Sequence, residues 1–220
     1  MSSNSRSLAF IGGTGPEGLG LAIRFAAAGD EVIIGSRRQE RADEAAEKIK
    51  EAVPQAKVRG MENKPAVEAA EIAFITVPFD GQVATCAELK DALAGKIVVD
   101  TVVPLTFEKG KAGALLVEEG SAAEQAQSIL TKSKVVGAFQ NLSAPELMKL
   151  DQEIPADVVV TGDDMEAKQT VMELAAKIKG LRAIDGGSLA SSRFVEEITA
   201  LLVNINKIYK AHSMIKIVGV

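Results

Sequence analysis

The sequence contains very few of the residues that form disulfides and zinc sites. Among 220 residues there is one cysteine, Cys86, and one histidine, His212. A single cysteine excludes an intramolecular disulfide and fits a reducing cytoplasm. One histidine and one cysteine also argue against a structural zinc site. We therefore expect a cytoplasmic protein without a bound metal.

The sequence also lacks an excess of positive charge and any long apolar run. There are 25 Lys and Arg against 30 Asp and Glu, which gives a net charge of -5. This balance offers no basic surface for nucleic acid or an anionic membrane. No segment approaches the roughly 20 apolar residues that span a bilayer. Residues 1–7 are polar and no apolar signal segment follows them, so we expect a disordered N-terminal tail rather than a signal peptide.

What the sequence does contain is a regular alternation of apolar runs and helical patterns. With 47% apolar residues, a chain of this length can bury a full core. One-sided helical stripes lie over residues 19–27 and 171–178. Apolar strands separated by helices favour a mostly parallel, doubly wound α/β sheet. The candidate strands are Leu8–Ile11, Glu31–Ile34, Lys57–Arg59, Ile72–Thr76, Ile97–Asp100, Val135–Gly137, Val158–Thr161 and Arg182–Ile184.

A glycine-rich turn directly follows the first candidate strand. Gly13-Thr14-Gly15-Pro16-Glu17-Gly18 has the pattern G-x-G-x-x-G. The first glycine permits a tight turn, the second lets the backbone approach a pyrophosphate, and the third lets helix and strand pack closely. The helix that follows presents free N–H groups to the phosphates, and Pro16 is tolerated so early in a helix. The turn therefore predicts a Rossmann-type dinucleotide site.

The same glycines also fit the pattern of the short-chain dehydrogenases. Gly12, Gly15 and Gly18 match G-x-x-G-x-x-G. That family needs a Tyr-x-x-x-Lys pair, but the only tyrosine, Tyr209, is followed four residues later by Ser213. We therefore reject this alternative.

The residues after the second candidate strand indicate which dinucleotide binds. An NAD site usually has Asp or Glu there, for the ribose hydroxyl. This chain has Ser36, Arg37 and Arg38, with Arg41 one turn further. Guanidinium groups bind a phosphate in bidentate fashion, and cations at a helix N-terminus oppose its dipole unless they have another partner. The pattern predicts NADP rather than NAD.

These features divide the chain into two predicted parts. Residues 8–140 would form the NADP-binding Rossmann domain, and residues 141–220 a smaller, helix-rich C-terminal α/β extension. An apolar helical stripe over residues 198–208 either packs on the core or also forms a subunit contact, and we expect a homodimer. Residues 101–124 form the least regular segment, which predicts a lid or substrate loop.

The nicotinamide is expected over the ends of the central strands. Thr76, Val77 and Pro78 lie at the end of one strand, Val103 follows the next, and Val77 with Val103 would form an apolar wall for a planar ring. After the third strand, small residues such as Ala138 would let a second planar molecule approach, and residues 139–141 offer stacking and hydrogen bonds. No His, Tyr or Lys is placed to protonate a carbonyl oxygen, so no catalytic side chain is predicted. A hydride passed between two stacked rings needs positioning more than acid–base chemistry.

Taken together, these residues resemble the F420:NADP oxidoreductases, which are NADPH-dependent reductases of coenzyme F420. The resemblance implies an N-terminal Rossmann domain, a small C-terminal part, a dimer, and hydride transfer between nicotinamide C4 and deazaflavin C5. Its motifs cover nearly the whole chain: Ile11–Gly15, Ile34–Arg38, Thr76–Pro78, Lys96–Val99, Val103-Pro104, Gly162–Asp164 and Tyr209–His212.

The resemblance also assigns roles to individual residues. It implies Thr14, Gly15, Pro16 and Glu17 on the pyrophosphate, mainly through the backbone, and the Ser36–Arg41 group on the 2′-phosphate. Thr76 to Pro78, Val103 and Ala138 would frame the nicotinamide. The residues implied nearest the deazaflavin are Phe79, Phe139, Gln140 and Asn141.

Three alternatives remain open at this point. In the first, the acceptor is a flavin or another electron carrier instead of F420. In the second, the substrate is a small imine or carbonyl compound, although the C-terminal part is short for such a reductase. In the third, the chain is a non-catalytic NADPH sensor whose apolar stripe over residues 195–208 contacts a partner.

Overall fold

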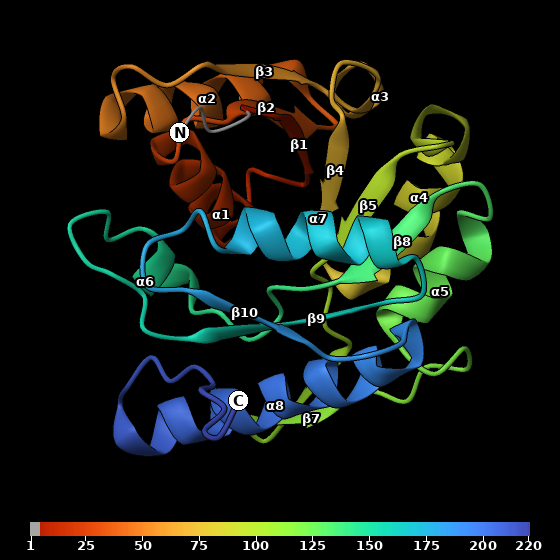
Figure 1. The fold of residues 1–220 in the computed structure, drawn as a ribbon, viewed down its shortest axis with the longest axis vertical. Helices are drawn as coiled ribbons and strands as arrows, with labels where there is room; N and C mark the ends of the chain where they lie inside the picture. Colours follow the sequence, from red (N-terminus) through yellow and green to blue (C-terminus); the bar gives the residue numbers. More distant parts are fainter. Residues whose placement is uncertain (1–4) are drawn as a thin grey trace.

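The structure is a computed structural model, and it describes residues 5–220. One eight-stranded sheet crosses the molecule in the order β10-β9-β8-β5-β4-β1-β2-β3 (Figure 1). All eight predicted strands are present. Their bounds are β1 (Ser7–Ile11), β2 (Glu31–Ser36), β3 (Val58–Glu62), β4 (Ile72–Ile75), β5 (Ile97–Asp100), β8 (Lys134–Gly137), β9 (Asp157–Gly162) and β10 (Arg182–Asp185).

Helices cover both faces of this sheet. Because side chains alternate along a strand, Leu8 and Phe10 of β1 enter one buried cluster and Ala9 and Ile11 the other. Helices α1, α2, α6 and α7 pack in the first cluster, and α3, α4 and α5 in the second. The predicted doubly wound α/β class is thus confirmed. The helices are α1 (Pro16–Ala27), α2 (Gln39–Ala52), α3 (Asn63–Glu68), α4 (Phe79–Leu93), α5 (Ala122–Ile129), α6 (Ala144–Leu147), α7 (Met165–Ala175) and α8 (Ser192–Tyr209), with a 3-10 turn at Leu189–Ser191.

The pairing is parallel except at one position. Strands β8 and β9 run antiparallel, with Gly137 opposite Thr161, while β9 and β10 are parallel to each other. The sheet therefore continues through the predicted boundary at residue 140. Figure 1 shows α7 and α8 on opposite sides of β9 and β10. Helix α8 also packs against α5.

The segment predicted to be an irregular lid contains a β-hairpin. Strands β6 (Leu105–Glu108) and β7 (Lys111–Ala114) pair antiparallel around Lys109 and Gly110, which both have positive φ. The side chain of Asn204 on α8 bonds the backbone of Ala112, at 2.9 Å to its N and 2.8 Å to its O. The expectation of an irregular segment is wrong for these residues, because this amide holds β7 on α8.

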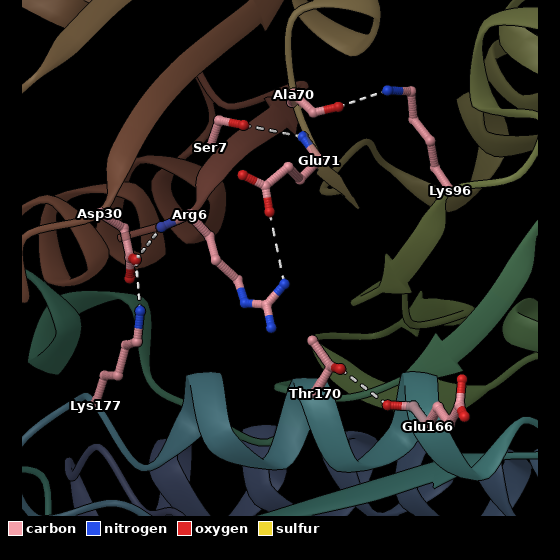
Figure 2. A network of polar contacts seen from close by, with 9 residues as sticks. All are labelled: Arg6, Ser7, Asp30, Ala70, Glu71, Lys96, Glu166, Thr170 and Lys177. Atoms are coloured by element: carbon pink, nitrogen blue, oxygen red, sulfur yellow. Dashed lines mark hydrogen bonds and ion pairs between the residues drawn. The ribbon is translucent and has the colours of Figure 1, made fainter. Parts of the chain in front are cut away.

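The prediction of a disordered tail is wrong for residues 5–7. Ser7 begins β1, the Ser5 hydroxyl donates to Gly29 O at 2.9 Å, and Arg6 N donates to Asp30 Oδ1 at 2.9 Å. Residues 1–4 lie outside the described residues. Arg6 and Asp30 belong to a polar network along the amino ends of the central strands, in which Lys177 also reaches Asp30 (Figure 2).

Candidate functional site

The register of the sheet brings four predicted segments to one edge. Ile11 of β1 lies opposite Ile75 of β4, Ile75 opposite Asp100 of β5, and Asp100 opposite Gly137 of β8. The strands run in the same direction, so the segments that follow them begin side by side. Strand β1 also marks the point where the chain turns from one half of the sheet to the other, since its neighbours are β2 and β4. Ligand crevices of doubly wound folds form at such a point.

The glycine turn has the tight geometry that its sequence requires. Gly12 has a φ of 81°, Gly13 N donates to Phe10 O, and Gly15 N donates to Gly12 O, both at 3.0 Å. A Cβ on Gly18 would lie 2.5 Å from Thr76 Oγ1 and 2.9 Å from Gly13 Cα. Gly18 is therefore needed for packing of α1 against the end of β4.

Gly15 differs from the other glycines of the turn. A Cβ there would meet only Gly12 O, at 3.5 Å, which is ordinary contact. Gly15 is also the N-cap of α1 and makes no side-chain cap bond. This position is open on the protein side, and an uncapped helix N-terminus of this kind can offer N–H groups to an anionic ligand.

The second strand ends in a cationic surface. Ser36 is buried at the end of β2 and its Oγ accepts from Arg38 N at 3.3 Å. Arg37, Arg38 and Arg41 are exposed, and within residues 5–220 none of them forms an ion pair. Three guanidinium groups thus stand without a counter-charge beside the glycine turn.

The strand ends next to the turn are mostly apolar. Val77, Phe79 and Val103 are half-buried, Pro78 is exposed, and Ala138 is buried. Ala138 N donates to Asp100 O at 3.1 Å, which fixes the start of the loop after β8. These residues lie in the row predicted to face the nicotinamide.

The loop after β8 turns its side chains inward. Phe139 has a φ of 70°, a strained value for an aromatic residue, and its ring is buried against Phe25 and Phe74. Asn141 Nδ2 donates to Val195 O at 2.8 Å and to Thr199 Oγ1 at 2.9 Å. The structure therefore places Phe139 in the core and Asn141 against α8.

The chain is similar to known proteins in both sequence and structure. Residues 7–104 match the family model described as NADP oxidoreductase, coenzyme F420-dependent. The F420-dependent NADP reductase of Methanocaldococcus jannaschii is 43% identical over 93% of this chain and 94% of its own length. That of Methanothermobacter marburgensis is 42% identical, over 90% of this chain and 92% of its own. This chain belongs to the F420-dependent NADP reductase family. The predicted resemblance is thus confirmed.

A solved structure agrees with this F420-dependent NADP reductase fold. The crystal structure titled a putative F420-dependent NADP reductase from Arthrobacter superposes with a TM-score of 0.80 at 24% identity, covering 95% of this chain and 96% of that one. At this identity the likeness concerns the fold. Within the described residues, no helix combines the length and apolar character needed to cross a membrane.

Sequence reasoning missed a buried polar cluster beneath the strand ends of this family member. Asp100 is fully buried; its Oδ1 accepts from Val102 N at 2.9 Å and its Oδ2 accepts from Gln82 Nε2. Glu196 of α8 accepts from Ala122 N at 2.8 Å and from Ala123 N at 3.1 Å. The only signal for Glu196 was a charged residue beside Val195 on an apolar stripe.

Burial dominates the electrostatics of this cluster. Burial, and then the neighbouring Glu196, raises the pKa of Asp100 to about 8. Burial raises the pKa of Glu196 to about 7 against the effect of its two backbone donors. Gln140 Nε2 lies 3.4 Å from Asp100 O, while the Oε1 atoms of Gln140 and Gln82 are buried with no partner. The cluster ties the loops after β5 and β8 to α5 and α8, so it positions the strand ends.

A further acid with a buried oxygen, Glu17, lies at this edge. It occupies the second position of α1, directly after Pro16. The residue as a whole is half-buried, but its Oε1 is buried and has no hydrogen-bond partner. Burial raises the pKa of Glu17 to about 8. His212, the one histidine of the sequence, is exposed, and its Nδ1 lies 2.8 Å from Glu146 Oε1.

Proposed function

We propose that this protein transfers a hydride between NADP(H) and coenzyme F420. The supporting observation is a single row of strand ends that contains an open glycine turn, uncompensated arginines and apolar residues. Family membership, with 43% identity to an F420-dependent NADP reductase, supports F420 as the second reactant.

The residues present fit an NADP molecule. The open position at Gly15 would let a pyrophosphate approach the backbone, and the uncapped start of α1 would offer N–H donors to it. Ser36 with Arg37, Arg38 and Arg41 would hold the 2′-phosphate, since guanidinium groups bind phosphate oxygens in pairs. An NAD-type carboxylate is absent from the end of β2, where Ser36 stands.

At the nicotinamide end of the site, the side chains need only to position the two rings and to exclude water. When both are bound, the dihydronicotinamide supplies the hydride and the deazaflavin accepts it. Val77, Pro78, Val103 and Ala138 would form the apolar wall, and Thr76 holds the end of β4 by donating to Ile11 O at 2.9 Å. Excluding water and fixing the approach are sufficient for transfer between stacked rings.

The predicted deazaflavin residues contribute in different ways. Phe79 is half-buried at the start of α4 and is available for contact. The side chains of Phe139, Gln140 and Asn141 are buried, so we propose that they act by shaping the loop after β8. Backbone groups of that loop would then meet the second ring system.

One assay tests the proposal against its alternatives. The protein is mixed with NADPH and with oxidised F420, FMN or small imines and carbonyls, and loss of the dihydronicotinamide absorbance is followed. We expect turnover with F420. Turnover with FMN or a carbonyl compound but not with F420 would identify that compound as the acceptor and contradict the proposal. Tight NADPH binding without any turnover would indicate a sensor.

We further propose a cytoplasmic homodimer. Large apolar side chains of α8 are exposed, with Phe194 59% and Leu201 56% accessible. Beside them, a hollow of about 470 Å³ lies between α8, Val159 of β9 and Ile215 and Ile217 of the C-terminal segment. A second copy would cover this face. Sedimentation should give a dimer, and Leu201→Glu should give monomers; a wild-type monomer would contradict the proposal.

A further inference from the structure

The position of Glu17 on α1 places its carboxyl beside the dinucleotide site. Residues three, four and seven apart share one helix face, so Glu17 lies in line with Gly20, Leu21 and Arg24. A Cβ on Gly20 would lie 2.7 Å from Leu147 Cβ and 3.5 Å from Ala144 O, in α6. Glu17 therefore faces the same side as α6.

The register along this face can be followed residue by residue. Arg24 donates to Leu147 O at 2.7 Å and to Glu146 O at 2.9 Å, whereas Gly20 lies against Ala144 and Leu147. Extended one turn towards the N-terminus, the same periodicity puts Glu17 on the side of the residues that precede α6, which form the loop after β8. The periodicity thus directs the carboxyl to the side between the phosphate turn and the loop assigned to the second ring.

Nothing in the described residues neutralises the buried oxygen. Glu17 Oε1 has no hydrogen-bond partner, and burial alone raises the pKa. An acid near a helix N-terminus normally gains from the helix dipole, but here desolvation outweighs that gain. The charged groups on the elements packed against α1, including the short segment after α6, are Arg24, Glu31, Glu40, Arg41, Asp43, Glu44, Glu47, Lys48, Lys50, Glu51, Glu146, Lys149 and Asp151, and His212 contacts Glu146.

We propose that Glu17 is a positioning residue that occupies the NADP(H) site as a neutral carboxylic acid and makes dinucleotide binding proton-linked. The inference rests on the proposed NADP(H) site. A carboxylate at this position would stand close to the pyrophosphate charges in a poorly hydrated place, whereas a carboxylic acid has an O–H to donate. The bound dinucleotide favours the protonated form, so binding takes up a proton wherever the free protein has lost it.

The sign and size of the effect follow from linkage. The free carboxyl is protonated below its pKa of about 8 and ionised above it. The dissociation constant for NADPH should therefore depend little on pH as the pH approaches about 7 from below, and should rise about tenfold between about pH 7 and about pH 9. The 2′-phosphate titrates near pH 6, which lies below this window.

The test uses equilibrium binding, independent of turnover. NADPH fluorescence gives the dissociation constant across the pH range, and no tryptophan is present to interfere. Calorimetry in buffers of different ionisation enthalpy gives proton uptake, expected at about half a proton near pH 8 and close to none near pH 6. Glu17→Gln keeps the shape and introduces an amide, which has an N–H to donate but does not titrate, so this variant should bind with a flat profile and no proton uptake in the window.

The matched control is Asp80→Asn. Asp80 holds the same second position in α4 and is exposed, so its removal should leave the pH profile unchanged. If Glu17→Gln keeps the wild-type pH profile and proton uptake, or changes only the unfolding midpoint, Glu17 is merely structural and the inference fails. If wild-type protein binds no NADPH at any pH, the proposed function fails instead.

Discussion

The two edges of the central sheet treat their polar groups differently. At the amino edge, Asp30 is 1% exposed, and its Oδ1 takes a hydrogen bond from Arg6 N and an ion pair from Lys177 at 2.5 Å (Figure 2). Lys96 Nζ there donates to Ala70 O at 2.5 Å. At the carboxyl edge, Glu17 Oε1 and Gln140 Oε1 are buried without partners. One edge is joined by its own contacts, and the other keeps unsatisfied groups where a ligand would bind.

The comparison separates stability from binding. Asp30 Oδ2 also lacks a partner, so not every polar group of the amino edge is hydrogen-bonded, but the interactions there link the starts of β1, β2 and β4 with the turn after α7. The carboxyl edge instead carries the strained φ of Phe139 and the open Gly15. Strain and unpaired polar groups cost stability, and they are retained where function uses them. Changes at one edge should therefore move folding, and changes at the other should move ligand affinity.

The largest expected effect is on stability, from Asp30→Ala. Removing the carboxylate leaves the part-buried Arg6 N–H without its Asp30 acceptor and removes the ion pair between Lys177 and the buried Asp30. We expect a loss of about 3 kcal/mol in the free energy of unfolding, measured by urea denaturation. The NADPH dissociation constant of the folded protein should not change. A matching loss of affinity would mean that the two edges are coupled.

The converse change is Gly15→Ala. The new Cβ fits the protein, with its nearest contact at 3.5 Å, but it would occupy the space that we propose for the pyrophosphate. We expect NADPH binding to weaken by ~2 kcal/mol, about thirtyfold, because charged hydrogen bonds to the backbone are lost. The unfolding midpoint should stay near the wild-type value. Gly18→Ala is the control, since its clash with Thr76 and Gly13 should lower stability as well.

A smaller effect tests the arginines at the carboxyl edge that form no ion pair within the described residues. Arg37→Glu should weaken NADPH by about tenfold more than NADH, since only NADPH carries the 2′-phosphate. Lys48→Glu makes the same charge change on exposed α2 surface, further along the helix, and should leave the preference intact. Equal losses for NADPH and NADH in Arg37→Glu would refute the 2′-phosphate assignment. Binding titrations with both nucleotides provide the measurement.

The sequence predicted the elements of both edges better than their details. All eight strands of the sheet were predicted, because most of them contain a short apolar run bounded by polar or glycine residues, as Ile72–Ile75 illustrates. Their apolar character does not encode direction, so the antiparallel pairing of β9 with β8 could not be read from it. The hairpin over Leu105–Ala114 was also missed, because its pairing depends on positive φ at Lys109 and Gly110 and on Asn204, far along the chain.

The site shows a similar limit. Position after a strand correctly indicated which segments meet, because parallel strands in register end at one edge. It could not tell that the backbone of Phe139 turns its ring into the core, nor that Asp100 and Glu196 would be neighbours across the fold. Both depend on contacts between distant residues. The binding assignments of individual side chains stay predictions for the experiments above.

The smallest expected effect is at the amino edge, from Glu71→Gln. The ion pair between Arg6 Nη1 and Glu71 Oε2 spans 3.5 Å, and the Glu71 side chain is 55% exposed. Water screens such a pair, so its loss should change the free energy of unfolding by less than about 0.5 kcal/mol. Glu71 N keeps its hydrogen bond to Ser7 Oγ at 3.0 Å in the variant, because that bond uses the backbone. Urea denaturation of Glu71→Gln and Asp30→Ala side by side compares an exposed pair with a buried one at the same edge. If the two variants lose equal free energy of unfolding, exposed pairs, and not the buried Asp30, hold the amino edge together.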